Sequence, residues 1–445
     1  MRSPLHRRFT APLAIAVVGG LALAGCSSEG GGASSGPGDF GDADGVVTVY
    51  GTIIDTEAEL LEESWADWEA ENDIEIQYEG SQEFEAQIGI RTQGGNPPDL
   101  AIFPQPGLLG DLASRDLVQP APEGVAANVD EFWSEDWASY GTVGDTLYGA
   151  PLMASIKGFI WYSPSQFEEN GWEVPTTLDG LLELTEQAES DLGAPPWCAG
   201  FGSDAATGWP GTDWVEDMVL RQAGPDVYDD WVSHDVEFSD PQIKEALDTV
   251  GEILLNPDYV NAGLGDVRSI NTTPFGDAAR VLGTGECALH HQASFFDGFI
   301  QDPDNGNATV GPDEDIWAFI TPAVEEGSNA VTGGGEIVAA FSNDEDTIAV
   351  QEYLSSPEWA NSRVSLGGVI SANTGLDPES ASSPILQEAI GILQDPETTF
   401  RFDASDLMPG AVGSAAFFTG MVDWINGASS DEVLSAIDAA WPSGE

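Results

Sequence analysis

The chain has 445 residues, and 77 acidic residues against 12 basic ones give it a formal net charge of −65. This charge repels nucleic-acid phosphates and anionic lipid headgroups, which excludes both as partners of the general surface. The chain is too long for one compact core, so we expect two or three domains. Its 14 Trp and 19 Phe residues supply ample apolar material for their cores.

The N-terminus has the arrangement of a secretory signal. A basic head over residues 2–8 precedes an apolar run over residues 9–24, which is shorter than the ~20 residues of a spanning helix. The run ends in Leu-Ala-Gly-Cys at residues 23–26, which resembles the lipobox of bacterial lipoproteins. That resemblance implies a signal peptide over residues 1–25, cleavage before Cys26 and acylation of its thiol with palmitate or a similar chain. We therefore expect an extracytoplasmic protein that is attached to the cell membrane by lipid alone.

A flexible tether is predicted over residues 26–45. This stretch is rich in Gly, Ser and Asp and contains a single aromatic residue. It cannot bury enough apolar surface to fold. The globular body is therefore expected to begin near Val46.

Three cysteines occur in the chain, and the lipid would consume Cys26. Cys198 and Cys287 then remain in an oxidising compartment, where we expect a disulfide between them. Two buried free thiols are the alternative. The four His residues do not provide the ligand spacing of a zinc site, so neither a metal nor another cofactor is predicted.

The first part of the body alternates strands with helices. The pattern predicts strands over 46–50, 74–78 and 99–103, and helices over 57–71, 84–93 and 108–116. Such alternation indicates a parallel α/β sheet. Ligands of these sheets gather at the loops beyond the carboxyl ends of the strands, which here are 50–52, 79–82 and 104–106.

The second part begins near residue 150 and mixes strands with helices. Strands are predicted over 158–162, 287–291, 316–320 and 336–341, and helices over 177–190, 214–223, 242–255, 277–282 and 347–354. A Gly- and Trp-rich loop is expected over 197–213. The glycines at 333–335 are expected to lead into the last strand.

The order of several short segments resembles that of the extracellular solute-binding proteins of ABC importers. The matching segments are Asn96–Leu100, Leu147–Pro151, Phe159–Ser163, Phe167–Gly171, Val174–Thr177, Ser355–Ala360 and Gly367–Ser371. A further segment, Phe402–Pro409, is similar to the narrower group that carries α-glucosides. The segments are collinear over nearly the whole mature chain, and this order carries the resemblance.

The resemblance implies a fold and a function. The fold would be α/β and of the type II periplasmic-binding-protein kind, with two lobes, a hinge and a ligand cleft between the lobes. One lobe would comprise residues 46–152 plus 328–370, and the other 153–327 plus 371–445. The protein would be a monomer without enzymatic activity that binds an oligosaccharide, such as a maltose-, trehalose- or sucrose-like sugar, and delivers it to permease subunits.

A sugar site needs aromatic platforms for the CH faces and planar polar groups for the hydroxyls. Trp209 lies between Gly208 and Pro210 in the predicted loop, and we expect it to contact ligand, with core packing as the alternative. Asp213 is a second candidate, although it could be only the N-cap of the next helix. Lys157 is a third, because the chain has just one other lysine.

Further candidates lie on segments that the resemblance brings to the cleft. Arg401 could contact ligand or pair with Asp403 or Asp406, and Asp403 is itself a candidate. The remaining predicted ligand-binding residues are Gln82, Asp99, Gln105, Gln292 and Gly334, of which Asp99 could instead cap local backbone.

A secreted, lipid-anchored glycoside hydrolase is the alternative function. It would need two carboxylates ~5–9.5 Å apart, which cannot be singled out among 77 acidic residues. The chain contains no nucleophile elbow, P-loop or metal signature. Collinearity with the binding proteins favours binding over hydrolysis.

Overall fold

The computed structural model describes residues 43–260, 265–325, 327, 329–395 and 397–442. The predicted signal peptide over residues 1–25, Cys26 and most of the predicted tether lie outside the described residues. Within the described part, no helix is both long enough and apolar enough to cross a membrane.

Two main sheets organise the fold. The strands are β1 (Val46–Gly51), β2 (Glu75–Gly80), β3 (Leu100–Phe103), β4 (Thr142–Val143), β5 (Thr146–Leu147), β6 (Gly149–Ile156), β7 (Phe159–Tyr162), β8 (Trp197–Cys198), β9 (Leu289–Gln292), β10 (Trp317–Ile320), β11 (Ala330–Ala340) and β12 (Thr399–Phe402). The larger sheet has the order β12-β11-β3-β1-β2, and β6 also pairs with β11. The smaller sheet has the order β10-β7-β9-β8. β1 pairs in parallel with β2 and β3, which confirms the predicted α/β arrangement of the first part.

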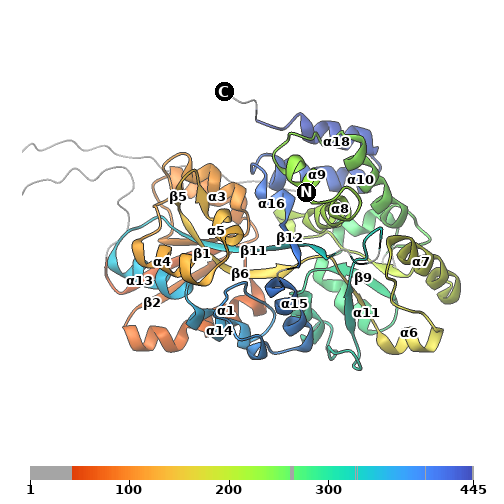
Figure 1. Ribbon diagram of the computed structural model, residues 1–445, viewed down its shortest axis with the longest axis horizontal. Helices are drawn as coiled ribbons and strands as arrows, with labels where there is room; N and C mark the ends of the chain where they lie inside the picture. The colour runs from red at the N-terminus through yellow and green to blue at the C-terminus, as the bar shows by residue number, and fades with distance from the viewer. Residues whose placement is uncertain (1–42, 261–264, 326, 328, 396, 443–445) are drawn as a thin grey trace, which may run out of the picture. The chain divides into compact units, whose positions relative to one another are not determined.

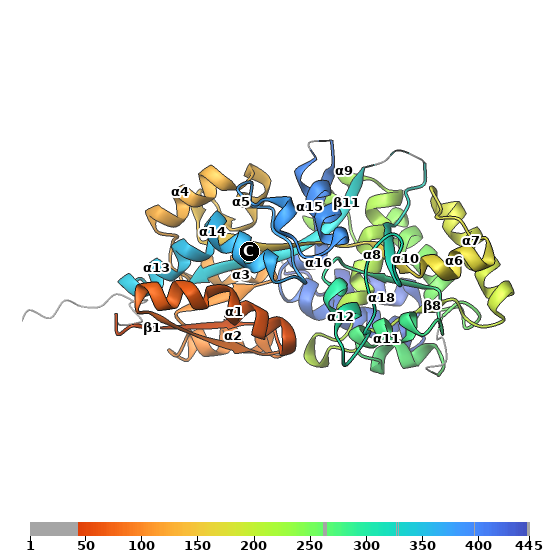
Figure 2. The same ribbon diagram turned by 90° about the horizontal axis from the view of Figure 1, so that it is seen from below.

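Helices cover both sheets. They are α1 (Asp55–Asn72), α2 (Phe84–Gln93), α3 (Pro106–Ala113), α4 (Glu123–Phe132), α5 (Glu135–Tyr140), α6 (Pro164–Asn170), α7 (Leu178–Leu192), α8 (Trp209–Gln222), α9 (Pro225–Val232), α10 (Pro241–Leu254), α11 (Ala278–Gly283), α12 (Phe296–Gln301), α13 (Glu345–Leu354), α14 (Pro357–Ser365), α15 (Pro384–Gln394), α16 (Ala404–Leu407), α17 (Phe418–Ile425) and α18 (Ser430–Asp438). Figures 1 and 2 show α1, α13 and α14 beside the larger sheet, and α8, α10 and α11 in the same region as the smaller sheet.

Local sequence explains where the predicted helices begin. Asp240 precedes α10, and its side chain accepts a hydrogen bond from the Gln242 amide at 2.9 Å. Thr177 caps α7 in the same way through the Gly180 amide. A capping oxygen satisfies one of the amides that a helix start leaves without an intrahelical partner. These two helices therefore begin within one residue of the prediction.

Two predicted boundaries are wrong. Helix α8 begins at Trp209, five residues before the predicted start at 214. Gly208 is its N-cap with a φ of 117°, and Pro210 lies in the first turn. Proline is tolerated there because the amide it lacks would have no intrahelical partner. Strand β11 begins at Ala330 and contains the glycines that were expected to precede it. A side chain at Gly335 would collide with the Met153 carbonyl and with Trp137, so the strand needs glycine there.

The predicted disulfide is confirmed. Cys198 in β8 and Cys287 before β9 are bonded, with their Cα atoms 5.7 Å apart and both residues fully buried. The bond links two segments that also meet through the parallel pairing of β8 with β9.

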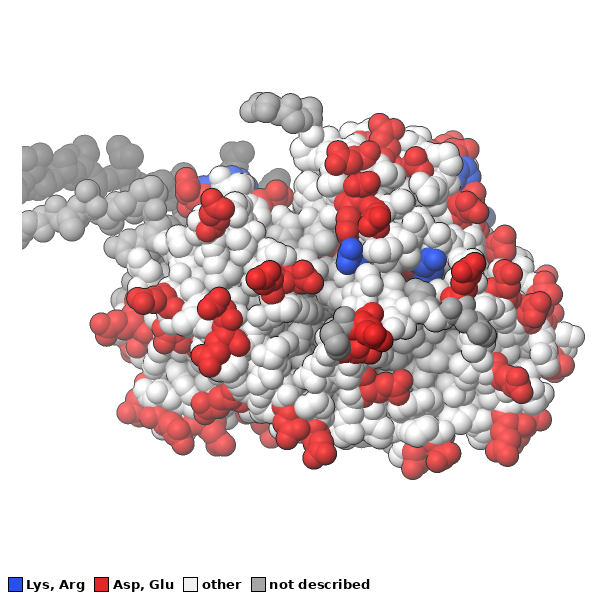
Figure 3. Space-filling view, in the orientation of Figure 1, with Lys and Arg blue, Asp and Glu red and all other residues white. Residues whose placement is uncertain are grey.

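The acidic side chains are spread over the surface. Figure 3 shows Asp and Glu scattered across the visible face and not gathered into one patch. This distribution is that of a solvated surface.

Replacing both Cys198 and Cys287 by Ala should lower the free energy of unfolding by about 2–5 kcal/mol, because the bond closes a loop of 89 residues in the unfolded chain. Urea denaturation of the variant and of the oxidised wild type measures the difference. Wild type treated with a reducing agent is the control and should behave like the variant. Equal midpoints for all three samples would contradict the prediction.

Candidate functional site

A buried lysine forms the centre of the candidate site. Lys157 follows β6 and is 8% exposed. Its ammonium donates to Asp213 Oδ1 at 2.8 Å and also to Asp403 Oδ2. These contacts join β6 to α8 and to the residue that precedes α16. We call Lys157, Asp213, Glu216, Asp403 and Asp406 the Lys157 cluster.

Helix α8 supplies two acids of the cluster. Asp213 and Glu216 are three residues apart, so they project from one face of the helix. Both are buried, at 3% and 1% exposure. The prediction that Asp213 caps this helix is wrong, because the helix has already begun four residues earlier and Gly208 is its cap.

The segment after β12 supplies the other two acids. The Asp403 amide donates to the Gly333 carbonyl at 2.7 Å, which continues the pairing of β12 with β11. Asp403 is the N-cap of α16 and accepts from the Ser405 amide and hydroxyl at 3.2 and 2.8 Å. The same amide donates to Glu216 Oε1 at 3.0 Å, so α16 and α8 are joined.

Charge balance sets the protonation of the cluster. Burial lowers the pKa of Lys157, but Asp213 and Asp403 outweigh it and raise this pKa well above its usual value. Burial raises the pKa of Asp213, Glu216 and Asp406. For Asp403, the Lys157 ammonium and a hydrogen bond with Glu216 overcome burial and hold the pKa well below its usual value. The ion pair is therefore Lys157 with Asp403, and Glu216 is stabilised as the neutral acid.

Three of these acids could also hold a cation. One oxygen each from Asp213, Glu216 and Asp403 lies within 4.8 Å of the others. Oxygen-only ligands of this kind suit hard ions such as Mg²⁺ or Ca²⁺. The Lys157 ammonium already bonds to two of the three, however, and supplies the positive charge that an ion would bring.

An aromatic wall adjoins the cluster. Trp209 is partly exposed, and its ring centroid lies 5.0 Å from that of Phe275 and 6.1 Å from that of Phe295. Both phenylalanines are partly exposed as well. The Lys157 ammonium is 5.6 Å from the Trp209 ring centroid, within the range of a cation–π contact. A rigid apolar face therefore meets charged groups at this point.

The far end of α8 is anchored by a second buried ion pair. Arg221 donates to Asp217 Oδ1 at 3.0 Å, and Thr332 donates to the same oxygen at 3.2 Å. His291 lies 3.4 Å from the other oxygen. This network fixes α8 against β9 and β11 and so positions Trp209 and Asp213.

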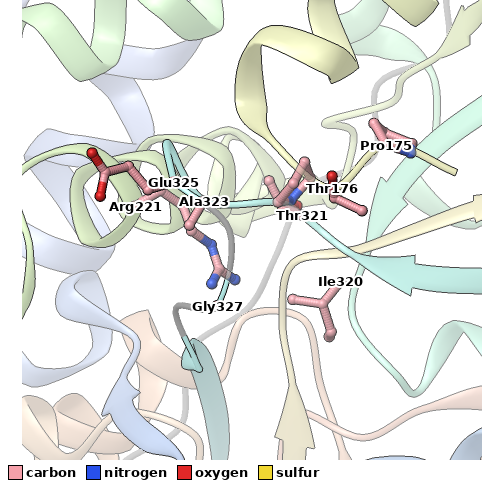
Figure 4. Close-up of a pocket in the computed structure, with 9 residues that line it drawn as sticks. Pro175, Thr176, Arg221, Ile320, Thr321, Ala323, Glu325 and Gly327 are labelled. Atoms are coloured by element: carbon pink, nitrogen blue, oxygen red, sulfur yellow. The ribbon is translucent and has the colours of Figure 1, made fainter.

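A pocket lies beside that anchor. It has a volume of about 250 Å³ and is lined by Pro175, Thr176, Arg221, Ile320, Thr321, Pro322, Ala323, Glu325 and Gly327. Figure 4 shows Arg221 together with residues from the segment that follows β10. None of the Lys157 cluster lines it.

The three candidates from the first part of the chain lie in different surroundings. Gln105 is buried before α3, and its amide nitrogen donates to Glu85 at 3.1 Å. Gln82 is partly exposed in the turn before α2. Asp99 lies at the amino end of β3, where its carboxylate accepts from the Thr48 amide and hydroxyl at 2.9 and 2.7 Å. The carboxylate of Asp99 therefore bonds to the neighbouring strand β1, 51 positions away in sequence, and not to backbone next to it in the chain.

The remaining candidates, Gly334, Gln292 and Arg401, also lie in different surroundings. Gly334 faces the cluster, because a Cβ on it would lie 3.2 Å from Lys157 Cε. Gln292 is buried, and its side-chain oxygen accepts from the next amide at 2.8 Å. Arg401 pairs with Asp229 through two bonds of 2.6 and 2.8 Å. The alternative role for Arg401, a pairing with Asp403 or Asp406, is wrong, because Arg401 pairs with Asp229 and Lys157 pairs with Asp403.

Sequence reasoning missed four residues of this region: Glu216, Asp406, Phe275 and Phe295. Glu216 follows Asp213 at helical spacing, and this signal was hidden because the helix was predicted to start at 214. Phe275 and Phe295 come from separate segments that approach Trp209 only in the folded chain.

Comparison with known proteins identifies the family. Residues 52–361 match the family described as bacterial extracellular solute-binding protein, and the chain belongs to it. The protein therefore acts outside the cytoplasm. Two relatives align over most of the chain. The osmoprotective compounds-binding protein GgtB of Synechocystis sp. is 37% identical over 92% of this chain and 95% of its own. The alpha-glucosides-binding periplasmic protein AglE of Rhizobium meliloti is 36% identical over 89% and 87%.

Solved structures agree on the fold. The bacterial solute receptor AcbH superposes with a TM-score of 0.75 at 17% identity, covering 89% of this chain and 98% of its own. Maltose-bound T. maritima MalE3 gives a TM-score of 0.70 at 14% identity, covering 88% and 98%. The predicted type II periplasmic-binding-protein fold is confirmed.

Replacing Lys157 by Met should destabilise the protein by about 3–5 kcal/mol at neutral pH, because buried carboxylates lose their counter-charge. Burial raises the pKa of Asp213, Glu216 and Asp406 in the folded state, so the folded variant takes up protons more readily than the unfolded chain. Its deficit should shrink as the pH falls and grow as the pH rises. Chemical denaturation at pH 5 and pH 8 measures both effects.

The chain supplies a matched control in its other lysine. Lys244 pairs with Asp248 on the surface of α10, and Lys244→Met should cost under about 0.5 kcal/mol. Equal losses for the two variants would contradict a central role for Lys157.

Proposed function

We propose that the protein binds an α-linked oligosaccharide outside the cell and delivers it to the permease of an ABC importer without transforming it. The observation that carries this proposal is the partly exposed Trp209, supported by Phe275 and Phe295 and set beside the Lys157 cluster. An aromatic face stacks on the CH face of a sugar ring, while buried charged groups bind its hydroxyls. AglE, whose name states that it binds α-glucosides, supports the class of ligand.

Hydrolysis is less well supported by the same geometry. Asp213 and Asp403 accept from Lys157, and Glu216 accepts from the Ser405 amide. A glycosidase needs one carboxylate free to act as nucleophile or base and a second poised to give up a proton. Asp213 and Asp403 are already bonded to Lys157, so neither carboxylate is free to act as the nucleophile or base. Carboxyl groups held in place in this way are suited to orient the hydroxyls of a bound sugar.

We also infer that two lobes, residues 46–152 plus 328–370 and 153–327 plus 371–445, close on the ligand about a hinge. Two of the proposed boundaries, near residues 153 and 371, come from segments that lie side by side, and this supports the proposal. Ala154 pairs with Gly335 on one side and forms a bridge with Ile370 on the other. A ligand that binds the closed form more tightly shifts the equilibrium toward closure, and the permease would then receive the closed monomer.

We propose that acylated Cys26 holds this binding protein at the membrane. The tether over residues 26–45 would set how far the body can move from its permease.

Titration calorimetry with maltose, trehalose, sucrose and maltotriose tests the function. We expect saturable heat with at least one of these sugars and no release of reducing sugar on long incubation. Absence of heat with all four, together with release of reducing sugar from a glycan, would contradict binding and favour the hydrolase.

Trp209→Ala should weaken binding of the sugar identified in that titration about ten-fold, since a stacked aromatic contributes ~1–1.5 kcal/mol. Calorimetry on the purified variant measures the change. Trp441→Ala is the matched control, because Trp441 is also partly exposed but stacks on His234, and its affinity should equal that of wild type. Unchanged affinity in Trp209→Ala would assign Trp209 to packing.

A further inference from the structure

One acidic residue outside the Lys157 cluster faces the same way as the cluster. Gly334 lies opposite Ser155 in the pairing of β11 with β6, and its missing side chain would point at Lys157. Glu336 is two residues further along β11, so it projects from the same face of the strand. It is the one residue of β11 that is not fully buried.

The side chains of Lys157 and Ser155 lie over Gly334. A Cβ at Gly334 would lie 3.2 Å from Lys157 Cε and 3.5 Å from Ser155 Oγ. A larger residue there would push against the Lys157 side chain. The Lys157 ammonium and the Ser155 hydroxyl therefore lie on this face of β11, and Glu336 follows on the same face as its partly exposed residue.

Glu336 belongs to a second group of charges, formed with Glu57 from the first turn of α1 and Arg363 from α14. Burial and Glu57 raise the pKa of Glu336 to about 7, while Arg363 and Lys157 act to lower it. The charges of Lys157, Glu57 and Arg363 therefore all act on the pKa of Glu336.

Arg363 is an unusual member of that group. It is fully buried, and its Nη1 donates to the Gly367 carbonyl at 2.8 Å. Its Nε and Nη2 have no hydrogen-bond partner within the described part of the chain. Buried donors are seldom left without partners unless something outside the chain completes the network. The guanidinium supplies positive charge to Glu336 without bonding to it.

We propose that Glu336 is a second ligand contact, whose carboxyl group binds hydroxyls of the sugar unit next to the one stacked on Trp209. This inference rests on the proposed function. A carboxyl group with a pKa near 7 both accepts from hydroxyls and, when protonated, donates to them. A ligand that contacts both Trp209 and Glu336 would present one sugar unit to each, so we expect a disaccharide to bind better than a monosaccharide. Arg363 and Glu57 are positioning residues that set the charge of Glu336.

Calorimetry on the full chain tests the inference with the best-bound sugar among maltose, trehalose and sucrose. Glu336→Gln should weaken binding about ten-fold, the value expected for a lost hydrogen bond to a charged group. The matched control is Glu358→Gln, an exposed acid on α14, which should bind like wild type. Thermal unfolding without ligand should show that Glu336→Gln is at least as stable as wild type.

Glu336→Asp keeps the charge but shortens the reach, and it should also bind more weakly. If both Glu336 variants are folded and bind with wild-type affinity, the inference is wrong, although the proposed function stands. If the wild type binds none of the sugars, the proposed function itself fails. A crystal structure of the complex gives a direct readout, with a Glu336 oxygen expected within ~3.2 Å of a ligand hydroxyl.

Discussion

The buried ammonium of Lys157 is the interaction on which the candidate site depends. From its position after β6, Lys157 bonds to Asp213 inside α8 and to Asp403, the residue that caps α16. These two acids are 56 and 246 positions away from it in the sequence. Without that charge, Asp403 could not remain ionised in a buried position. The fold itself therefore holds these carboxylates in position, and a ligand does not have to organise them on binding.

The glycines of β11 impose a second constraint. Gly333 and Gly335 allow the backbone of β6 and the rings of Phe400 and Trp137 to approach closely, and Gly334 leaves room for the Lys157 side chain itself. The same strand pairs with β6, β3 and β12. One strand thus joins the sheet, packs against the Lys157 side chain and carries Glu336 on the same face, so larger residues in place of its glycines would displace Lys157 and its neighbours.

The fold could largely be predicted from the sequence, and the site only in part. The alternation of strand and helix up to residue 116 depends on local patterns, and β1, β2, α2 and β3 follow them closely. Lys157 stood out because the chain has a single other lysine, and Trp209 because of its glycine and proline neighbours. The partners of these residues are set by contacts distant in sequence. Arg401 illustrates the limit, since Asp403 and Asp406 are close to it in sequence, yet Asp229 on α9 binds it. Helix α8 illustrates a second limit of sequence-based prediction. The run Gly-Trp-Pro-Gly predicts a loop, but in the structure Gly208 has a positive φ and serves as the N-cap of the helix.

The charge of the whole molecule and the charge of the site together restrict the ligand. A body with a net charge of −65 repels anions as they approach. Inside the site, Lys157 offsets one carboxylate, and the raised pKa values of Asp213, Glu216 and Asp406 favour their neutral forms. What remains is a set of closely spaced hydrogen-bonding groups with little uncompensated charge, beside an aromatic wall. A flat, neutral molecule with many hydroxyls satisfies both the groups and the wall, whereas a compact cation would have to compete with the ammonium that already bonds to two of the carboxylates.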